Sequence, residues 1–156
     1  MSATSAPFGL RPAFFPTGLE RAQALTNGIT SGYASNILKN QPVVYGSTAN
    51  GGTLGTIIPA AATGAITGAF AGVEFTDTTG RRRVSNYWPA STSGTNIIAY
   101  FYNDLNIVYE IQSDATMAQT SIGNEYNFSN ITAGSSTTGL SAATLGVSTV
   151  AGAGNQ

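Results

Sequence analysis

Residues 70–89 read FAGVEFTDTTGRRRVSNYWP, and no other part of the chain concentrates apolar, charged and aromatic residues in this way. Val73 and Phe75 alternate with small or charged neighbours, which is the period-two pattern of a half-buried strand. The run TDTTG that follows consists of turn formers, and Gly80 can adopt the positive φ that closes a tight loop. The chain then returns to Pro89, which ends the second strand because proline donates no ladder hydrogen bond. This stretch predicts a β-hairpin with a cationic tip.

Outward from this hairpin, short apolar runs bounded by turn formers recur at a spacing of roughly 8–12 residues. We predict strands at 42–45, 53–58, 66–75, 96–102, 107–112, 121–122, 126–130 and 145–150. This spacing is typical of an all-β fold, here a single β-barrel or β-sandwich domain. The run 96–102, NIIAYFY, is apolar on both faces and predicts a central strand covered on both sides. The predicted core contains Val73, Phe75, Trp88, Ile98, Phe101, Ile107, Tyr109 and Ile111.

We divide the chain into an extended N-terminal arm, residues 1–35, and a β domain, residues 36–156, with a flexible C-terminal end rich in Ser, Thr, Gly and Ala. Three prolines between residues 7 and 16 disfavour helix in the arm and stiffen it for binding. The large apolar residues between them must dock on this domain, on a sister subunit or on another protein, because an extended arm cannot bury them on itself. We expect these residues to dock on a neighbouring molecule and not on the core of their own chain.

Composition restricts the chemistry that this chain can perform. The 156 residues include no cysteine and no histidine, which excludes thiol chemistry and removes the commonest general base and metal ligand. Of the seven acidic residues, Glu74 and Glu110 sit on predicted strands, and a glycosidase-like pair stays a remote third alternative. We predict no catalytic residue, no cofactor and no metal. The net charge of −1 argues against partnership with nucleic acid or an anionic membrane. No N-terminal export signal is visible.

The three consecutive arginines admit two interpretations. They form either a solvated hairpin tip or a cationic patch that pairs with carboxylates of a partner. Strand alternation places Arg82 on the face opposite to Arg81 and Arg83, so at most two of them meet one partner surface. The predicted partner-binding residues combine the arm with this cluster: Phe8, Leu10, Arg11, Phe14, Phe15, Arg81, Arg82 and Arg83.

Several segments together resemble small structural proteins of tailed bacteriophages, namely capsid cement or decoration proteins. These segments are PFGLRP (7–12), GVEFTDTTGRRR (72–83) with SNYW (85–88), VYEIQ (108–112), SIGN (121–124) and TTGLS (137–141). The resemblance covers residues 7 to 145 and implies a β-rich knob on the outside of a phage head.

On this reading we expect a homo-oligomer, a dimer or a trimer, that is made in the host cytoplasm and clips neighbouring major capsid subunits together on the virion surface. The leading alternative is a carbohydrate-binding or adhesive β module of a head fibre or tail.

Overall fold

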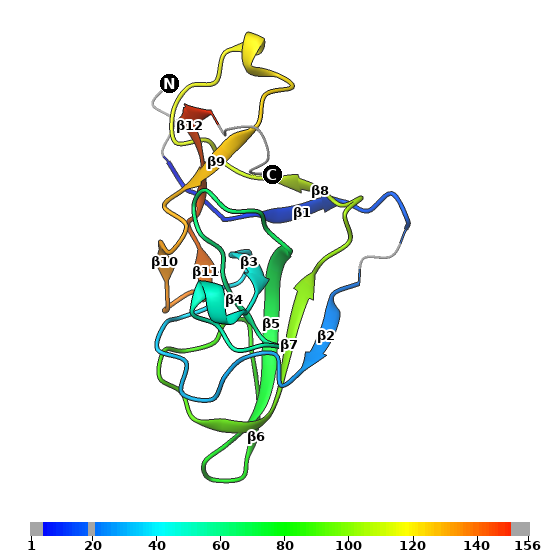
Figure 1. The fold of residues 1–156 in the computed structure, drawn as a ribbon, viewed down its shortest axis with the longest axis vertical. Helices are drawn as coiled ribbons and strands as arrows, with labels where there is room; N and C mark the ends of the chain where they lie inside the picture. Colours follow the sequence, from blue (N-terminus) through cyan, green and yellow to red (C-terminus); the bar gives the residue numbers. More distant parts are fainter. Residues whose placement is uncertain (1–4, 19–20, 151–156) are drawn as a thin grey trace.

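Strand β5 (Gly68–Asp77) is the strand on which the main sheet is built (Figure 1). The computed structural model describes residues 5–18 and 21–150, and all the strand pairs of this sheet are antiparallel. Along one edge β5 pairs with β7 (Gly94–Tyr102). Along the other edge it pairs first with β3 (Pro42–Tyr45) and then with β6 (Arg82–Ser85). The predicted hairpin is therefore confirmed as β5 and β6, although β6 ends at Ser85, before Trp88.

The main sheet continues on both sides and stays open. β2 (Gln23–Thr26) pairs with the outer edge of β7, and β4 (Ile57–Pro59) pairs with β3. Among the described residues β2 and β4 form no strand pair, so the sheet does not close into a barrel. One backbone hydrogen bond, from Ile57 N–H to the Gly28 carbonyl at 2.7 Å, spans the gap between them.

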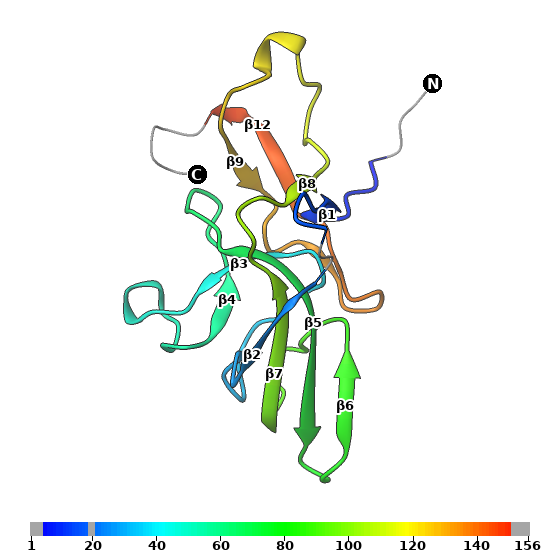
Figure 2. The same ribbon diagram turned by 90° about the vertical axis from the view of Figure 1, so that its right-hand side faces the viewer.

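Three two-stranded antiparallel sheets complete the all-β fold that the sequence predicts. They pair β1 (Arg11–Phe14) with β8 (Val108–Glu110), β9 (Tyr126–Ser129) with β12 (Thr144–Val150), and β10 (Gly134–Ser135) with β11 (Leu140–Ser141). The first two lie beyond the end of the main sheet where β5 begins (Figures 1 and 2). The helical segments of the described residues are two 3₁₀ turns, η1 (Thr48–Asn50) and η2 (Gln119–Ser121). An arrangement of several antiparallel sheets that do not close into a barrel fits a β-sandwich-like fold.

The main core lies on one face of the large sheet, where Phe75 and Trp88 meet edge to face with ring centroids 5.1 Å apart. Most of the predicted core is confirmed as buried, namely Val73, Phe75, Trp88, Phe101 and Ile107. Ile98 differs, because Ile97 and Phe101 point into the core and strand alternation sends Ile98 to the opposite, half-buried face. The run 96–102 is therefore covered fully on one face only. Tyr109 and Ile111 pack, partly buried, against a second cluster.

That second cluster draws the N-terminal arm into the chain's own domain. Leu10 is 5% exposed and packs with Ala69 and Phe128, and β1 pairs with β8. Gly9, at φ +74°, permits this path, because a Cβ there would lie 2.4 Å from the Asn40 carbonyl oxygen. For Leu10 the expectation of docking on a neighbour is thus corrected: the arm completes a core of its own chain.

The boundary between arm and domain also differs from the predicted division at residues 35 and 36. β2 is a strand of the main sheet, and Ile29 is 2% exposed in the main core. The region before residue 36 therefore contributes to the β domain. The predicted flexible C-terminal end begins after β12, and residues 151–156 lie outside the described part of the chain.

Residues 38–41, which we call the junction, lie where three parts of the chain meet. Leu38, Asn40 and Gln41 are buried, and the side chain of Lys39 is exposed. Asn40 donates its N–H to the Phe70 carbonyl at 2.7 Å, and Phe70 N–H bonds back to the Gln41 carbonyl at 2.9 Å. Leu10 N–H donates to the Asn40 carbonyl at 2.7 Å. The junction therefore fastens β5 to the N-terminal arm through backbone hydrogen bonds.

Gln41 ties the same junction to the C-terminal half of the chain. Its side chain is 1% exposed, and its amide donates to the Ile131 carbonyl at 3.1 Å while its Oε1 accepts from Leu38 N–H at 2.8 Å. Lys39 N–H donates to the Gly139 carbonyl at 2.9 Å. A buried glutamine is tolerated here because both ends of its amide are hydrogen-bonded.

Two substitutions in the arm test which apolar side chains belong to the domain. We expect Leu10→Ala to lower the free energy of unfolding by about 2–5 kcal/mol, because it empties a buried position. Phe14→Ala should change it by less than about 0.5 kcal/mol, because that side chain is 61% exposed. Urea unfolding followed by tryptophan fluorescence measures both. Equal, small effects of the two variants would contradict the docking of Leu10.

Candidate partner-binding surfaces

Asp77 organises the tip of the hairpin between β5 and β6. Its Oδ1 accepts hydrogen bonds from Thr79 Oγ1 at 2.6 Å, Thr79 N–H at 2.9 Å and Arg81 N–H at 3.0 Å. Its Oδ2 pairs with Arg83 Nε at 2.7 Å. These donors, led by the Thr79 hydroxyl and Arg83, hold the pKa of the Asp77 carboxyl well below its usual range. Gly80, at φ +82°, closes the loop and lets Arg81 begin the return.

Arg82 lies on the other face of the hairpin and has its own carboxylate. Its Nη2 is 2.7 Å from Glu74 Oε1, which also accepts the hydroxyl of Tyr100 at 2.9 Å. The hydrogen bond to Glu74 raises the pKa of Tyr100, as do burial and the charge of Glu74. The strand register confirms that Arg82 and Arg83 face opposite sides, since Arg82 is paired with Thr76 and Arg83 with Phe75.

The structure thus separates the three predicted cationic contacts. Arg82 and Arg83 are neutralised within the chain, and their side chains stay about half exposed, so each ion pair contributes only about 0–1 kcal/mol. Arg81 is exposed, and its guanidinium forms no ion pair with any described residue. Of the cluster, Arg81 is therefore the cation that remains available to a partner.

The predicted binding residues of the arm also divide into those that contact their own chain and those that face solvent. Arg11 pairs with Glu110, its cross-strand partner on β8, at 2.6 Å, and its guanidinium lies 4.6 Å from the centroid of the Phe8 ring. Phe8 is half-buried, and its carbonyl accepts a hydrogen bond from the Asn40 side chain at 3.1 Å. Phe8, Leu10 and Arg11 consequently hold the arm on the domain. Leu10 is buried and Phe8 half-buried, whereas the side chain of Arg11 stays about half exposed.

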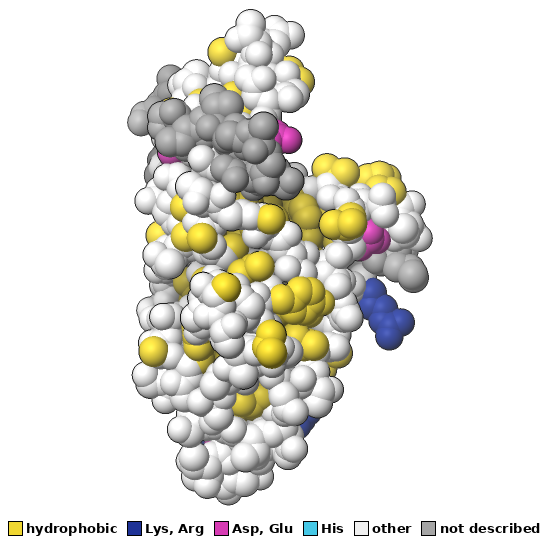
Figure 3. Space-filling view, viewed as in Figure 1, with side chains coloured by type: hydrophobic (Ala, Val, Ile, Leu, Met, Phe, Trp, Pro, Cys, Tyr) yellow, Lys and Arg dark blue, Asp and Glu magenta, His cyan; other side chains and the backbone are white. Residues whose placement is uncertain are grey.

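Phe14 is the member of the arm that faces solvent. It pairs with Val108 across β1 and β8, and the two side chains are 61% and 52% exposed. Leu105, three residues before β8, is 96% exposed. We call these three residues the β1–β8 patch, and Figure 3 shows hydrophobic side chains gathered over that end of the two strands. Phe15 turns away to contact the ring of Tyr102 at a centroid distance of 5.6 Å.

Sequence reasoning missed two members of this patch. Val108 alternates with the predicted core residues Ile107 and Tyr109, so strand alternation places it on the face opposite to them. Leu105 lies in the turn NDLN (103–106), outside the predicted strands and their core. An apolar residue in a polar turn was the sequence signal that could have indicated an exposed binding residue.

A projecting loop, residues 113–125, forms a second exposed surface. It includes η2 and extends beyond the β9–β12 pair, at the top of Figures 1 and 2. Met117 is 39% exposed and Ile122 is 78% exposed. The prediction of a strand at 121–122 was wrong, because η2 covers Gln119–Ser121 and residues 121–122 pair with none of the described strands. The start of the loop is fastened to β12, where Asp114 N–H donates to the Leu145 carbonyl at 2.9 Å.

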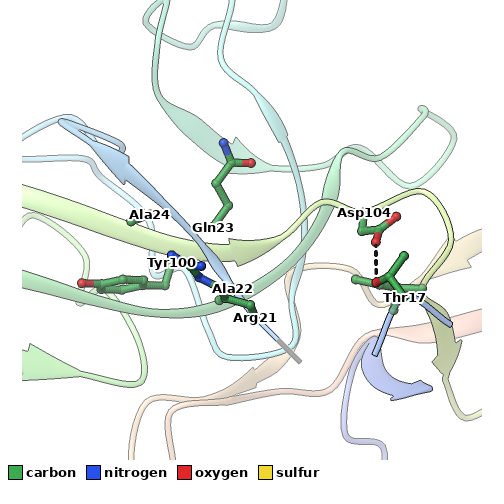
Figure 4. A pocket seen from close by; sticks show the side chains of 8 residues that line it. Thr17, Arg21, Ala22, Gln23, Ala24, Tyr100 and Asp104 are labelled. Atoms are coloured by element: carbon green, nitrogen blue, oxygen red, sulfur yellow. Dashed lines mark hydrogen bonds between the residues drawn. The ribbon is translucent and has the colours of Figure 1, made fainter. Parts of the chain in front are cut away.

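A hollow of about 660 Å³ opens beside β2 and the end of β7. Figure 4 shows Tyr100, Ala22 and Arg21 on one side and Asp104 with Thr17 on the other. Thr17 Oγ1 donates to Asp104 Oδ2 at 3.4 Å, and the backbone hydrogen bond from Asn106 is the main cause of a lowered pKa at Asp104. The lining residues are Thr17, Arg21, Ala22, Gln23, Ala24, Tyr100, Asp104 and Ile107.

Glu74 and Glu110, the two carboxylates of the glycosidase-like alternative, are bound to different partners on different sheets. Glu74 is bound to Arg82 and Tyr100 on the main sheet, whereas Glu110 is bound to Arg11 on the β1–β8 pair. Within residues 5–18 and 21–150, no group of three or more His, Cys, Asp or Glu side chains is placed to hold a metal ion. In the same ranges no helix is long and apolar enough to cross a membrane.

Substitution of Asp77 tests the hydrogen-bonded hairpin tip through pH. Because folding lowers the pKa of this carboxyl from its ordinary 3.8, its contribution to stability is present above about pH 4 and is lost as the pH falls through the folded-state value. We expect Asp77→Asn to be less stable than wild type at pH 7 and to lose less stability between pH 5 and pH 2.5. Urea unfolding at a series of pH values measures this.

The matched control is Glu125→Gln, which neutralises an exposed carboxylate that has no hydrogen bond or ion pair among the described residues. Parallel stability curves for Asp77→Asn and wild type would contradict this role of Asp77.

A scan of protein-family models, a search of curated proteins and a search of solved structures find no match to this chain.

Proposed function

We propose that the chain is a capsid cement, or decoration, protein of a tailed bacteriophage. It binds the outer surface of the head as a homo-oligomer and stabilises contacts between major capsid subunits. The observation that carries this proposal is the β1–β8 patch, an exposed apolar surface on a chain that has few charges. Clustered apolar side chains on a protein surface mark interaction sites.

The β1–β8 patch is held rigidly, which favours binding. The Arg11–Glu110 pair joins the two strands, and Leu10 anchors β1 in the second cluster. Because the patch is ordered before it meets a partner, little conformational entropy is lost on docking. Burial of a large apolar side chain such as Phe14 against a capsid subunit contributes about 1.5–3 kcal/mol.

The projecting loop supports a bridging role. Its Met117 and Ile122 are exposed, and it is a separate surface from the β1–β8 patch (Figure 1). A cement protein has to contact more than one subunit, and two weak contacts on one molecule combine into strong attachment. If both contacts exist only on the mature lattice, binding stabilises that lattice by linkage.

Arg81 supplies the charged part of the proposed contact. Its guanidinium is unpaired within the described chain, whereas Arg82 and Arg83 already have carboxylate partners. A capsid carboxylate can accept two parallel hydrogen bonds from such a planar group. We therefore assign the capsid contact of the arginine cluster to Arg81.

Saccharide binding is the second candidate function, and the hollow beside β2 favours it. Tyr100 offers an aromatic ring, and Asp104 offers a carboxylate that its hydrogen bonds already orient. Such a pairing suits a polyhydroxylated ligand, which stacks its apolar face and donates its hydroxyls.

Titration of the protein with surface oligosaccharides of bacteria, followed by NMR, tests this alternative. Saccharide binding predicts shifts confined to the hollow and about tenfold weaker binding by Tyr100→Ala, with Phe14→Ala unchanged. Shifts spread over the surface, or none, would contradict it.

Occupancy on purified heads that lack this protein tests the capsid proposal. We expect Phe14→Ala and Leu105→Ala each to weaken binding about tenfold to a hundredfold, the equivalent of one lost apolar contact. Leu54→Ala is the matched control, because Leu54 is 75% exposed but lies away from the patch. Failure of the wild-type protein to bind heads, or equal binding by all three variants, would overturn the proposal.

A further inference from the structure

β6 is an edge strand with a free outer side. It pairs with β5 and with no other strand of the described chain, and it lies at the margin of the molecule in Figure 2. At the hairpin tip Asp77 N–H bonds to the Arg81 carbonyl at 2.9 Å. Hydrogen-bonded pairs alternate along antiparallel strands, so Arg83 and Ser85 bond to β5. Arg82 and Val84 therefore direct their backbone N–H and C=O groups away from the sheet.

The side chains of this edge do little to protect it. Val84 is 80% exposed in the middle of the strand. Edge strands are commonly protected from pairing by charged side chains that repel an incoming strand. Here Glu74 neutralises Arg82 and Asp77 neutralises Arg83, each at 2.7 Å, so two β6 strands can approach without strong repulsion.

We propose that β6 pairs with β6 of a second copy of this chain, antiparallel and about a two-fold axis that passes beside Val84. The main sheets of the two copies then form one continuous sheet. This inference rests on the homo-oligomer in the proposed function and names its contact surface, but it does not depend on capsid binding.

The sequence around Val84 selects this register and this partner. A two-fold axis at Val84 places the two valines opposite each other, with two backbone hydrogen bonds between them, and places Arg83 opposite Ser85. If the two-fold axis lay at Arg83 instead, the Arg83 side chains of the two copies would lie opposite each other. Directly opposed like charges destabilise a sheet. β6 is therefore complementary to itself in one arrangement, and a second copy satisfies that arrangement without any other protein.

Cysteine crosslinking tests the register directly, because the chain has no cysteine of its own. Opposed residues in a hydrogen-bonded antiparallel pair have Cα atoms about 5.5 Å apart, within the range that a disulfide spans. We expect Val84→Cys to form a disulfide-linked dimer upon mild oxidation of the purified full-length chain. Leu54→Cys is the control: its side chain is nearly as exposed, at 75%, but lies away from β6, and it should crosslink far less.

A charge substitution tests the association without a crosslink. Sedimentation equilibrium should give twice the mass of the chain for wild type and for Leu54→Lys. For Val84→Lys the dissociation constant should rise at least about tenfold, because two lysines then oppose each other. Circular dichroism establishes that Val84→Lys keeps the β fold, as expected for a change at an exposed side chain.

Equal crosslinking of the two cysteine variants, a monomeric wild type, or a mass that Val84→Lys leaves unchanged would each overturn the proposal. The outcome is separable from the capsid proposal. Head occupancy that persists in a Val84→Lys monomer leaves capsid binding intact, whereas a dimer that fails to bind heads leaves this inference intact.

Discussion

The fold depends on burying the backbone of residues 38–41 without leaving its polar groups unpaired. Buried N–H and C=O groups must find partners, and in this junction the partners come from distant parts of the chain. Within these four residues the backbone bonds to the carbonyl of Phe70 on β5, to the N–H of Leu10 in the arm and to the carbonyl of Gly139. The arm, the main sheet and the C-terminal strands are therefore parts of one hydrogen-bonded structure.

Much of the sheet could be predicted because apolar alternation is a local signal. Val73 and Phe75 lie where the period-two pattern places them, and Asp77–Gly80 marks the turn between β5 and β6. The junction could not be predicted in this way, because two of its buried residues, Asn40 and Gln41, are polar and are typical of loops. Their burial depends on tertiary partners, and periodicity carries no information about those.

The candidate surfaces show the same limit of sequence reasoning. Arm residues that look alike in sequence have opposite roles, since Leu10 is buried and Phe14 is exposed. Proline spacing indicates an extended segment but does not say which surface it covers. The arginine cluster was recognisable, yet only the strand register assigns Arg82 to Glu74 and Arg83 to Asp77. Val108 joins Phe14 only because β1 and β8, far apart in the chain, pair with each other.

The junction also dictates the order in which the molecule can be assembled during synthesis. Its partners extend from Leu10 to Ser141, so nearly the whole chain must leave the ribosome before the last of them arrives. Closing such long loops loses chain entropy before the contacts compensate, and folding through distant β contacts is slow for that reason. Until then, the strands of the main sheet are present with open edges, and nascent copies are exposed to wrong pairing with one another. The chain therefore reaches its native state through its most aggregation-prone stage.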